Sequence, residues 1–318
     1  MDGLLIVDKP VGPSSHDVVA RARRALGERR IGHTGTLDPE ASGVLPLVLG
    51  KATRLARFLS TSDKSYEAVV RLGLSTTTYD AAGKPAGTPF TGTLPSQVVI
   101  DAALESYRGS FLQQPPAYSA KKVGGHPSYK LARRADRRKT AGMEPEAPEE
   151  GALAPARVST SALEILQLDR DCVTLRVDCS AGFYVRSLAH DLGERLGTGA
   201  HLLALRRTRS GDARLQDALP LDVIESREHG RDVADAVIPL SRMLPDLVVL
   251  PLTDEGVRHA GHGRLLSPSD FVNPVNLLNL VNPSSESLYR LVEPGGNLIG
   301  IARPSQTPGL LHPFVILM

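Results

Sequence analysis

The chain has 318 residues, of which 41% are hydrophobic and 23% are charged, and its formal net charge is +2 at pH 7. This composition is typical of a folded, soluble protein whose core needs no disulfide staples, and the length suits about two domains. No apolar run approaches the roughly 20 residues of a membrane span, and the opening residues, MDGLLIVDKP, lack the basic start and apolar core of a secretion signal. We therefore predict a cytoplasmic protein that does not cross a membrane.

The two cysteines indicate the same kind of compartment. Cys172 and Cys179 are seven positions apart, so on a strand they point to opposite faces. Neither a disulfide nor a shared metal ion is favoured by that arrangement. A reducing compartment is the simpler interpretation.

Basic residues gather in three clusters, although the chain as a whole is nearly neutral. A single cluster is most simply a solvated helix face, whereas three of them indicate basic surfaces balanced by acidity elsewhere, as expected of a protein that binds a polyanion. The clusters are Arg21, Arg23, Arg24, Arg29 and Arg30; Lys130, Arg133, Arg134, Arg137, Arg138 and Lys139; and Arg206, Arg207 and Arg209.

The N-terminal part of the chain predicts alternating strands and helices. Residues 4–8 form a short apolar strand, and a helix follows with Ser14 or Ser15 as its N-cap and Gly27 as its stop. Residues 64–74 are expected to form a strand with two distinct faces. One face carries Tyr66, Ala68, Val70 and Leu72.

The middle of the chain contains two segments without a regular hydrophobic pattern. Residues 81–95 are rich in turn formers and precede a helical pattern at 96–109. Residues 142–155 hold four glutamates and three prolines and show no hydrophobic period. This composition predicts a loop there.

The C-terminal half of the chain shows two kinds of sequence pattern. Residues 161–169 and 172–180 are expected to pair as strands, and an amphipathic helix follows over 182–197, ending at a glycine. Short strands rich in Pro, Asn and Gly come later, including a hairpin over 289–303 whose turn is PGGN. We place a domain boundary near residue 245.

Asp38 lies in the segment GTLDPE, between Leu37 and Pro39. A residue before proline is driven out of the helical region, so Asp38 is predicted to lie in a turn. The chain shows no correctly spaced Walker loop, dinucleotide fingerprint or helical metal-ligand pair. A carboxylate on a constrained turn, with arginines and a tyrosine that could converge on it, suits covalent or acid–base chemistry on an anionic ligand. Taken alone, however, Asp before Pro is also an ordinary turn signal.

Five segments in order resemble the bacterial tRNA pseudouridine synthase B family, and the resemblance covers most of residues 3 to 211. The most specific of them is GHTGTLDPEASGVLPLVLGKATR, which is similar to the catalytic motif of that family. The five segments are residues 4–19, 32–54, 62–83, 115–133 and 179–211.

The resemblance implies a catalytic role for three residues. Asp38 matches the family's essential aspartate, which acts on the uridine or its ribose so that the glycosidic bond breaks and the uracil re-bonds through C5. Tyr66 matches the tyrosine that stacks against the target base and assists removal of the C5 proton. Arg186 matches the arginine that pairs with the catalytic carboxylate. A guanidinium there would keep a desolvated carboxylate ionised.

Four further residues are assigned to substrate binding by the same resemblance. His33 matches the histidine that enters the T-loop as the target nucleotide leaves it, and Asp80 matches an acidic residue near the site. Lys122 matches a lysine that contacts RNA, and Leu205 matches an apolar residue that lines the pocket.

The resemblance also implies a fold and a partner. The expected class is α/β (α+β), a pseudouridine synthase fold with an extended, mixed, largely antiparallel sheet in a catalytic domain at residues 1–244. An RNA-clamping insertion is expected at about 113–156, and a small PUA-like RNA-binding β-barrel at 245–318. The implied reaction converts uridine 55 in the T-loop of tRNA to pseudouridine without a cofactor or metal. The T-arm would be the partner of a monomer with no obligate protein partner.

Other interpretations stay open at this point. The enzyme could modify another RNA, or the chain could be a non-catalytic RNA-binding or chaperone protein. Such a protein would not need Asp38, Tyr66 and Arg186 together. Tyr66 could also be a core tyrosine, and Arg186 could simply lie in the first turn of its helix. Residues 142–155 are expected to affect RNA affinity and not the chemistry.

Overall fold

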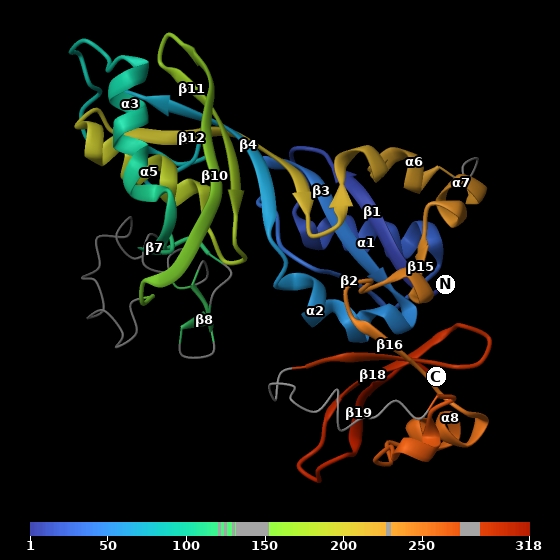
Figure 1. Cartoon of the computed structure of the whole chain (residues 1–318). Helices are drawn as coiled ribbons and strands as arrows, with labels where there is room; N and C mark the ends of the chain where they lie inside the picture. Colours follow the sequence, from blue (N-terminus) through green and yellow to red (C-terminus); the bar gives the residue numbers. More distant parts are fainter. Residues whose placement is uncertain (120–121, 124–125, 129–130, 132–152, 227–229, 274–286) are drawn as a thin grey trace.

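A computed structural model gives the fold of most of the chain (Figure 1). The residues that it describes are 1–119, 122–123, 126–128, 131, 153–226, 230–273 and 287–318. Nearly all of the loop predicted at 142–155, and most of the insertion expected at about 113–156, lie outside these residues. Among the described helices, none is long and apolar enough to cross a membrane.

One large sheet forms the body of the protein. Its strands are β1 (Gly3–Lys9), β2 (Ile31–His33), β3 (Ala41–Leu49), β4 (Lys64–Leu72), β7 (Gly109–Gln113), β10 (Ala156–Asp169), β11 (Cys172–Cys179), β12 (Ala200–Ser210), β13 (Ala213–Arg214), β14 (Leu219–Pro220) and β15 (Ile238–Pro239). The main path runs β14–β1–β3–β12–β4–β11–β10–β7. Along it, β1–β14 and β3–β12 are parallel and the other pairs are antiparallel. The mixed, largely antiparallel sheet predicted from the sequence is therefore confirmed.

The helices of the large body are short, and their ends follow the capping signals of the sequence. They are α1 (Ser15–Leu26), α2 (Ala56–Ser60), α3 (Gln97–Leu104), α5 (Val185–Leu196), α6 (Leu221–Glu225) and α7 (Gly230–Asp235). Ser14 caps α1 in a reciprocal capping box with Asp17, and Gly27 ends it in the left-handed conformation. α5 ends in the same way at Gly197. These boundaries confirm the two helices predicted from periodicity.

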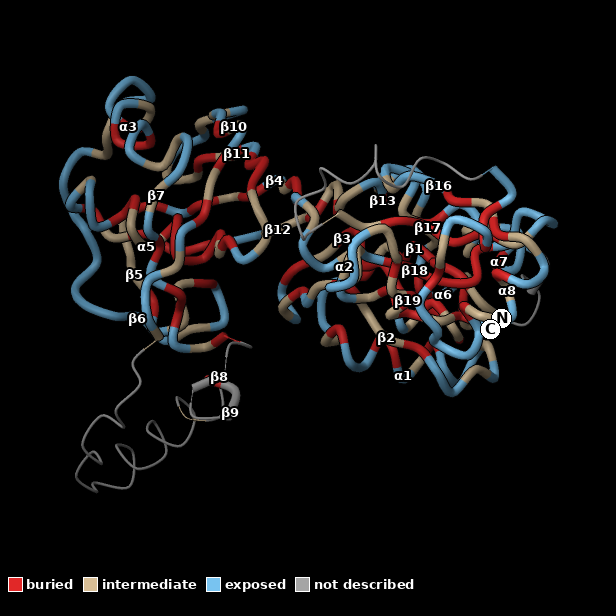
Figure 2. Tube along the Cα trace, turned by 60° about the horizontal axis from the view of Figure 1, so that its bottom comes forward, coloured by how far each residue is buried: buried red, intermediate tan, exposed pale blue. Residues whose placement is uncertain are grey.

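The core of the large body has two halves that meet along β4 and β12 (Figure 1). One half packs α3 and α5 against β11, and the other packs α1 and α6 against β3. Buried residues run through both halves in Figure 2. Tyr66 and Leu205 are partly buried and pack against both clusters. These two residues therefore mark the line along which the two halves meet.

Two pairs of very short strands lie beside the main sheet. They are β5 (Ser75–Thr76) with β6 (Pro85–Ala86), and β8 (Lys122–Val123) with β9 (His126–Pro127). The β5–β6 pair follows β4, and β6 lies within the turn-rich residues 81–95.

The C-terminal segment forms a second, four-stranded sheet with one helix. The elements are β16 (Val248–Pro251), α8 (Asp254–Gly261), β17 (Tyr289–Val292), β18 (Leu298–Pro304) and β19 (Leu311–Ile316), and the sheet order is β16–β17–β18–β19. The hairpin predicted over 289–303 is confirmed by the antiparallel β17–β18 pair.

Among the described residues these four strands form an open sheet, and the closed β-barrel expected from the sequence is not formed by strand pairing. The segment from Leu266 to Phe271 links the two edge strands instead. Leu266 forms an isolated bridge with Leu311 at the start of β19, and Phe271 forms one with Leu252 just after β16. The segment from Leu266 to Phe271 thus contacts both edges of this open sheet through single bridges.

The small sheet packs directly on the large body. A shared apolar cluster contains Leu4, Val48, Ala52 and Leu55 from the large body and Val292, Leu298, Ile301, Val315 and Leu317 from the small sheet. The guanidinium of Arg57, on α2, lies 4.8 Å from the ring centroid of Phe314, on β19. The two sheets therefore share a core and are joined by a cation–π contact.

Candidate active site

Asp38 lies in the loop between β2 and β3. The amide of Ala41 donates to the carbonyl of Asp38 at 3.1 Å, which closes a turn that contains Pro39. The proline fixes its own φ and disfavours the helical region for Asp38. The sequence-based prediction that Asp38 lies in a turn is thus confirmed, and its side chain is 42% exposed.

Two buried side chains from the N-terminal segment hold this loop. Lys9 is completely buried, and its ammonium donates to the carbonyls of Pro39 at 3.2 Å and Ala41 at 2.6 Å. The hydroxyl of Ser15 donates to the carbonyl of Leu37 at 2.9 Å and accepts from its amide at 2.8 Å. Backbone groups on both sides of Asp38 therefore have fixed partners, which limits the movement of the carboxylate.

Arg207 holds the other end of the loop from β12. Its side chain is 1% exposed, and the guanidinium donates to the carbonyls of Val44 at 2.7 Å, Gly35 at 3.1 Å and Thr36 at 3.5 Å. Gly43 allows the backbones of β3 and β12 to lie close together, because a Cβ there would lie 2.2 Å from the carbonyl oxygen of Arg207. The parallel pairing of β3 with β12 thus brings a buried cation beneath the loop.

Arg186 contacts the Asp38 carboxylate from the first turn of α5. Its Nε lies 2.9 Å from Oδ2 of Asp38. Its Nη2 donates to the carbonyl of Tyr118 at 2.8 Å, its Nη1 donates to the carbonyl of Thr78 at 3.2 Å, and Nη1 also lies 3.7 Å from Oδ2 of Asp80. The guanidinium is therefore held by acceptors on several sides, and one edge remains for Asp38.

The protein environment shifts three titrations at this site. Burial raises the pKa of Asp38 above its ordinary value of 3.8; Asp80 acts in the same direction, while Arg186 and Lys9 oppose the shift. Burial lowers the pKa of Lys9 from 10.5 to about 8. Burial also raises the pKa of Tyr66 above its ordinary value of 10.0. Asp38 lines one end of a pocket. Its carboxylate is therefore surrounded mostly by protein but remains accessible to a ligand in the pocket.

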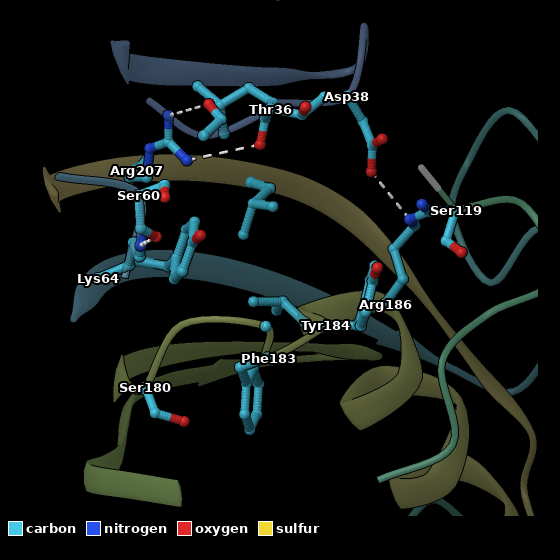
Figure 3. A pocket seen from close by; sticks show the side chains of 16 residues that line it. Thr36, Asp38, Ser60, Lys64, Ser119, Ser180, Phe183, Tyr184, Arg186 and Arg207 are labelled. Carbon is cyan, nitrogen blue, oxygen red and sulfur yellow. Dashed lines mark hydrogen bonds and ion pairs between the residues drawn. The ribbon is translucent and has the colours of Figure 1, made fainter. Parts of the chain in front are cut away.

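A pocket of about 260 Å³ joins Asp38 to the line where the two core halves meet. Figure 3 shows Asp38 and Arg186 paired at one end of this pocket, with Lys64 and Arg207 at the other end. The lining residues are Gly35, Thr36, Leu37, Asp38, Ser60, Lys64, Tyr66, Ser119, Ser180, Gly182, Phe183, Tyr184, Val185, Arg186, Leu205 and Arg207. In the described ranges, no group of three or more His, Cys, Asp or Glu is arranged to hold a metal ion.

The structure brings four of the seven site residues predicted from the sequence to this pocket. They are Asp38, Tyr66, Arg186 and Leu205. Asp80 lies behind Arg186, outside the pocket lining. His33 lies on β2 with its ring 5.6 Å from that of His16, and its buried Nδ1 has no hydrogen-bond partner among the described residues. Lys122 falls in β8, and its side chain is not among those described.

Three residues that support the site were not predicted from the sequence. Lys9, Ser15 and Arg207 hold the Asp38 loop but carry no catalytic pattern. One usable signal was Lys9, a charged residue directly after the run LLIVD. For Arg207, the strand pairing that buries it could not be read from local sequence.

Two protein-family models match the chain. The first, TruB family pseudouridylate synthase (N terminal domain), matches residues 23–185. The second, tRNA pseudouridylate synthase B C-terminal domain, matches residues 186–250. The first match includes the Asp38 loop, and the second begins at Arg186.

Curated relatives are similar over most or all of the chain. The tRNA pseudouridine synthase B of Solibacter usitatus is 40% identical over 317 residues, which is 100% of both chains. The enzyme of the same name from Geobacillus kaustophilus is 42% identical over 84% of this chain and 91% of its own length. That of a Mycobacterium species is 44% identical over 84% of this chain and 85% of its own.

Solved structures show the same fold at lower identity. A chain of an H/ACA ribonucleoprotein bound to a substrate RNA containing 2′-deoxyuridine has a TM-score of 0.70 and 23% identity, covering 99% of this chain and 85% of that one. A chain of the archaeal box H/ACA sRNP Nop10-Cbf5 complex gives a TM-score of 0.70 at 24% identity, with coverage of 99% and 86%.

Proposed function

The chain belongs to the TruB family of pseudouridylate synthases, and from this premise we propose that it converts uridine 55 in the T-loop of tRNA to pseudouridine through Asp38. The family assignment makes the protein a tRNA pseudouridine synthase with a mixed α/β pseudouridine synthase fold. The position in the tRNA and the roles of individual residues belong to the proposal.

The ion pair between Asp38 and Arg186 at the pocket carries this proposal. A carboxylate removed from water is driven towards its neutral form unless a cation or hydrogen bonds stabilise the charge. The Nε of Arg186, 2.9 Å from Oδ2 of Asp38, supplies both a charge and a hydrogen bond. Arg186 therefore favours the ionised form of Asp38, which can attack or accept a proton while it faces the pocket.

The chemistry is an isomerisation, so every atom of the substrate is found in the product. The bond between N1 and C1′ of the nucleotide breaks, the uracil turns within the site, and a bond forms between C5 and C1′. The proton leaves C5, and N1 ends with a proton. No electrons are exchanged with another molecule and no group is transferred to one, so Asp38 and its neighbours need only stabilise charge, hold the free base and move a proton.

Tyr66 and Leu205 supply the surface that holds the base. Extruding a nucleotide from a folded loop costs a few kcal/mol of stacking, and stacking on an aromatic side chain recovers roughly 1–3 kcal/mol per base. Tyr66 lines the pocket together with Leu205. Burial raises the pKa of Tyr66, so its phenol is protonated at neutral pH and stacks as an uncharged ring.

Three further residues are proposed to act around the pocket. His33 enters the T-loop in place of the extruded nucleotide; burial, His16 and Arg207 lower its pKa, so it is uncharged at neutral pH and suited to a stacked interior. Asp80 supports Arg186 from behind. Lys122 contacts RNA phosphates.

We propose that the two sheets belong to two domains with different functions. Residues 1–244, with an RNA-clamping insertion at about 113–156, form the catalytic domain, and residues 245–318 form a PUA-like domain that binds RNA. The support for this division is the separate small sheet, which begins with β16 at Val248. We also propose that the protein acts as a monomer in the cytoplasm, with the T-arm of tRNA as its partner.

The test is to map the product on a full-length, unmodified tRNA transcript. We expect pseudouridine at position 55 alone, detected by carbodiimide modification and primer extension. A transcript with cytidine at that position serves as the matched control and should remain unmodified. Pseudouridine at other positions would indicate a different RNA target, and tight binding without any product would indicate a non-catalytic RNA-binding protein.

A further inference from the structure

Tyr79 has a backbone conformation that a tyrosine rarely adopts. Its φ is 64°, in the left-handed region that favours glycine. Its ring stacks on the imidazole of His190, with centroids 3.8 Å apart and planes 6° from parallel. A strained residue of this kind persists only when its surroundings hold it in place. The stack on His190 is such a constraint.

The two members of the stack belong to the two elements that meet at Arg186. Tyr79 lies between Thr78, whose carbonyl accepts from Nη1 of Arg186 at 3.2 Å, and Asp80, whose Oδ2 lies 3.7 Å from the same nitrogen. His190 lies four residues after Arg186 on α5, so the two side chains occupy one face of the helix. The stack therefore joins the segment that carries the acceptors to the helix that carries the guanidinium.

In the part of the chain that the structure describes, backbone–backbone hydrogen bonds join the same segment to β12 and none joins it to α5. The amide of Leu202 donates to the carbonyl of Tyr79 at 2.9 Å, and the amide of Ala81 donates to the carbonyl of Leu202 at 3.0 Å. A second contact with α5, between the hydroxyl of Ser75 and Glu194 at 3.5 Å, is exposed and lies two helical turns beyond Arg186. Of these two contacts with α5, the stack of Tyr79 on His190 is the nearer to Arg186.

We propose that Tyr79 and His190 form a positioning pair that holds Thr78 and Asp80 against Arg186 and so keeps the Arg186 guanidinium directed at Asp38. The inference deepens the proposed function, on which it rests. Without the stack, Tyr79 can leave its left-handed conformation, and the carbonyl of Thr78 moves away from Nη1. Arg186 then loses one of the acceptors that orient its Nε towards Asp38.

The pair can be tested by removing and restoring its rings. We expect Tyr79→Ala and His190→Ala each to lower kcat for pseudouridine formation by about 10- to 100-fold with little change in KM, because a small displacement of a catalytic group has effects of this size. Tyr79→Phe and His190→Phe keep a stacked ring and should restore most of the turnover. The double alanine variant should be no worse than the poorer single variant, because both remove the same contact.

A second readout does not depend on turnover. The charged groups around Asp38 are Arg186, Asp80 and Lys9. If Arg186 is displaced, the Asp38 carboxyl should titrate at higher pH in Tyr79→Ala than in the wild type, as followed by NMR of protein labelled with ¹³C-aspartate. Tyr107→Ala is the matched control, since it removes a half-buried tyrosine 5.9 Å from the Arg195 guanidinium of α5 and leaves the Tyr79 segment intact. It should lower stability without moving the Asp38 titration.

Failure of the positioning role can be distinguished from failure of the proposed function. A wild-type protein without turnover on tRNA would contradict the proposed function, while the Asp38 titration would still decide whether the pair positions Arg186. A Tyr79→Ala variant whose Asp38 titrates as in the wild type, or whose kcat is unchanged in an active enzyme, would overturn the positioning role.

Discussion

The Nε of Arg186 lies 2.9 Å from Oδ2 of Asp38, and this contact joins the first turn of α5 to the loop between β2 and β3. The Arg186 side chain is 7% exposed and the Asp38 side chain is 42% exposed. The cation is therefore buried behind the anion, and the anion faces the pocket. A substrate can reach the carboxylate while its counterion stays fixed.

Replacing Arg186 by Gln should shift the pH dependence of turnover. Turnover that requires ionised Asp38 is lost as the pH falls through the pKa of that group, which burial already raises above 3.8 and Arg186 holds down. Arg186→Gln should therefore move the acid limb of kcat to higher pH and lower its maximum. Turnover measured from pH 4 to 8 tests this, with Arg176→Gln on β11 as the control, because it removes the ion pairs of an exposed arginine with Glu164 and Asp178. An acid limb at the same pH in both variants would contradict the role of Arg186.

Replacing Lys9 by Met should show how much the buried charge of Lys9 lowers the free energy of unfolding. The folded-state pKa of Lys9 is lowered from 10.5 to about 8, so the unfolded chain binds more protons between these values. Stability from this group is present above pH 10.5 and is lost as the pH falls through about 8. The free energy of unfolding of the wild type, relative to Lys9→Met, should therefore rise by up to about 3 kcal/mol from pH 7.5 to 10.5, since each pKa unit is worth about 1.4 kcal/mol.

Denaturant unfolding of the two proteins at both pH values measures this difference directly. Subtracting the variant from the wild type cancels the other titrating groups, because they are common to both chains. A difference that stays constant or shrinks as the pH rises would show that Lys9 is not a charged, buried clamp.

Gly43→Ala should separate the Asp38 loop from Arg207. A Cβ at Gly43, where φ is +101°, would lie 2.2 Å from the carbonyl oxygen of Arg207, so β3 or β12 has to move. We expect a loss of roughly 2–4 kcal/mol in the free energy of unfolding, together with a fall in turnover. Gly87→Ala is the matched control, since φ is +84° there but a Cβ would meet no atom of the described residues within 4 Å. Its cost should be only about 1–2 kcal/mol with turnover unchanged, and equal effects of the two variants would contradict the close approach of the strands.

Local sequence predicted the elements that local physics determines. Ser14 and Gly27 mark the two ends of α1, and the turn in 294–297 marks the β17–β18 hairpin. Motif similarity identified the four site residues that the structure brings to one pocket. Those signals depend on neighbours in the chain or on a shared pattern, so they are visible without a structure.

The supporting contacts depend on pairings between distant segments, which is why the sequence did not predict them. Arg207 reaches the Asp38 loop only because β12 pairs in parallel with β3. Lys9 is charged, and charged residues are expected at the surface unless paired. The left-handed conformation of Tyr79 has no sequence signal, because glycine is the residue that usually marks it. The small sheet was expected to close as a barrel, but among the described residues it is open, and its two edges are linked only by single bridges from the segment between Leu266 and Phe271.

We propose that Asp38 carries out the chemistry of a uridine isomerisation. The most direct measurement is release of tritium from C5-labelled uridine in a tRNA T-arm hairpin by the wild type and by Asp38→Asn, with binding of the hairpin measured in parallel. We predict release by the wild type and none by the variant, with binding retained in both. Tritium release by Asp38→Asn at the wild-type rate would contradict the account.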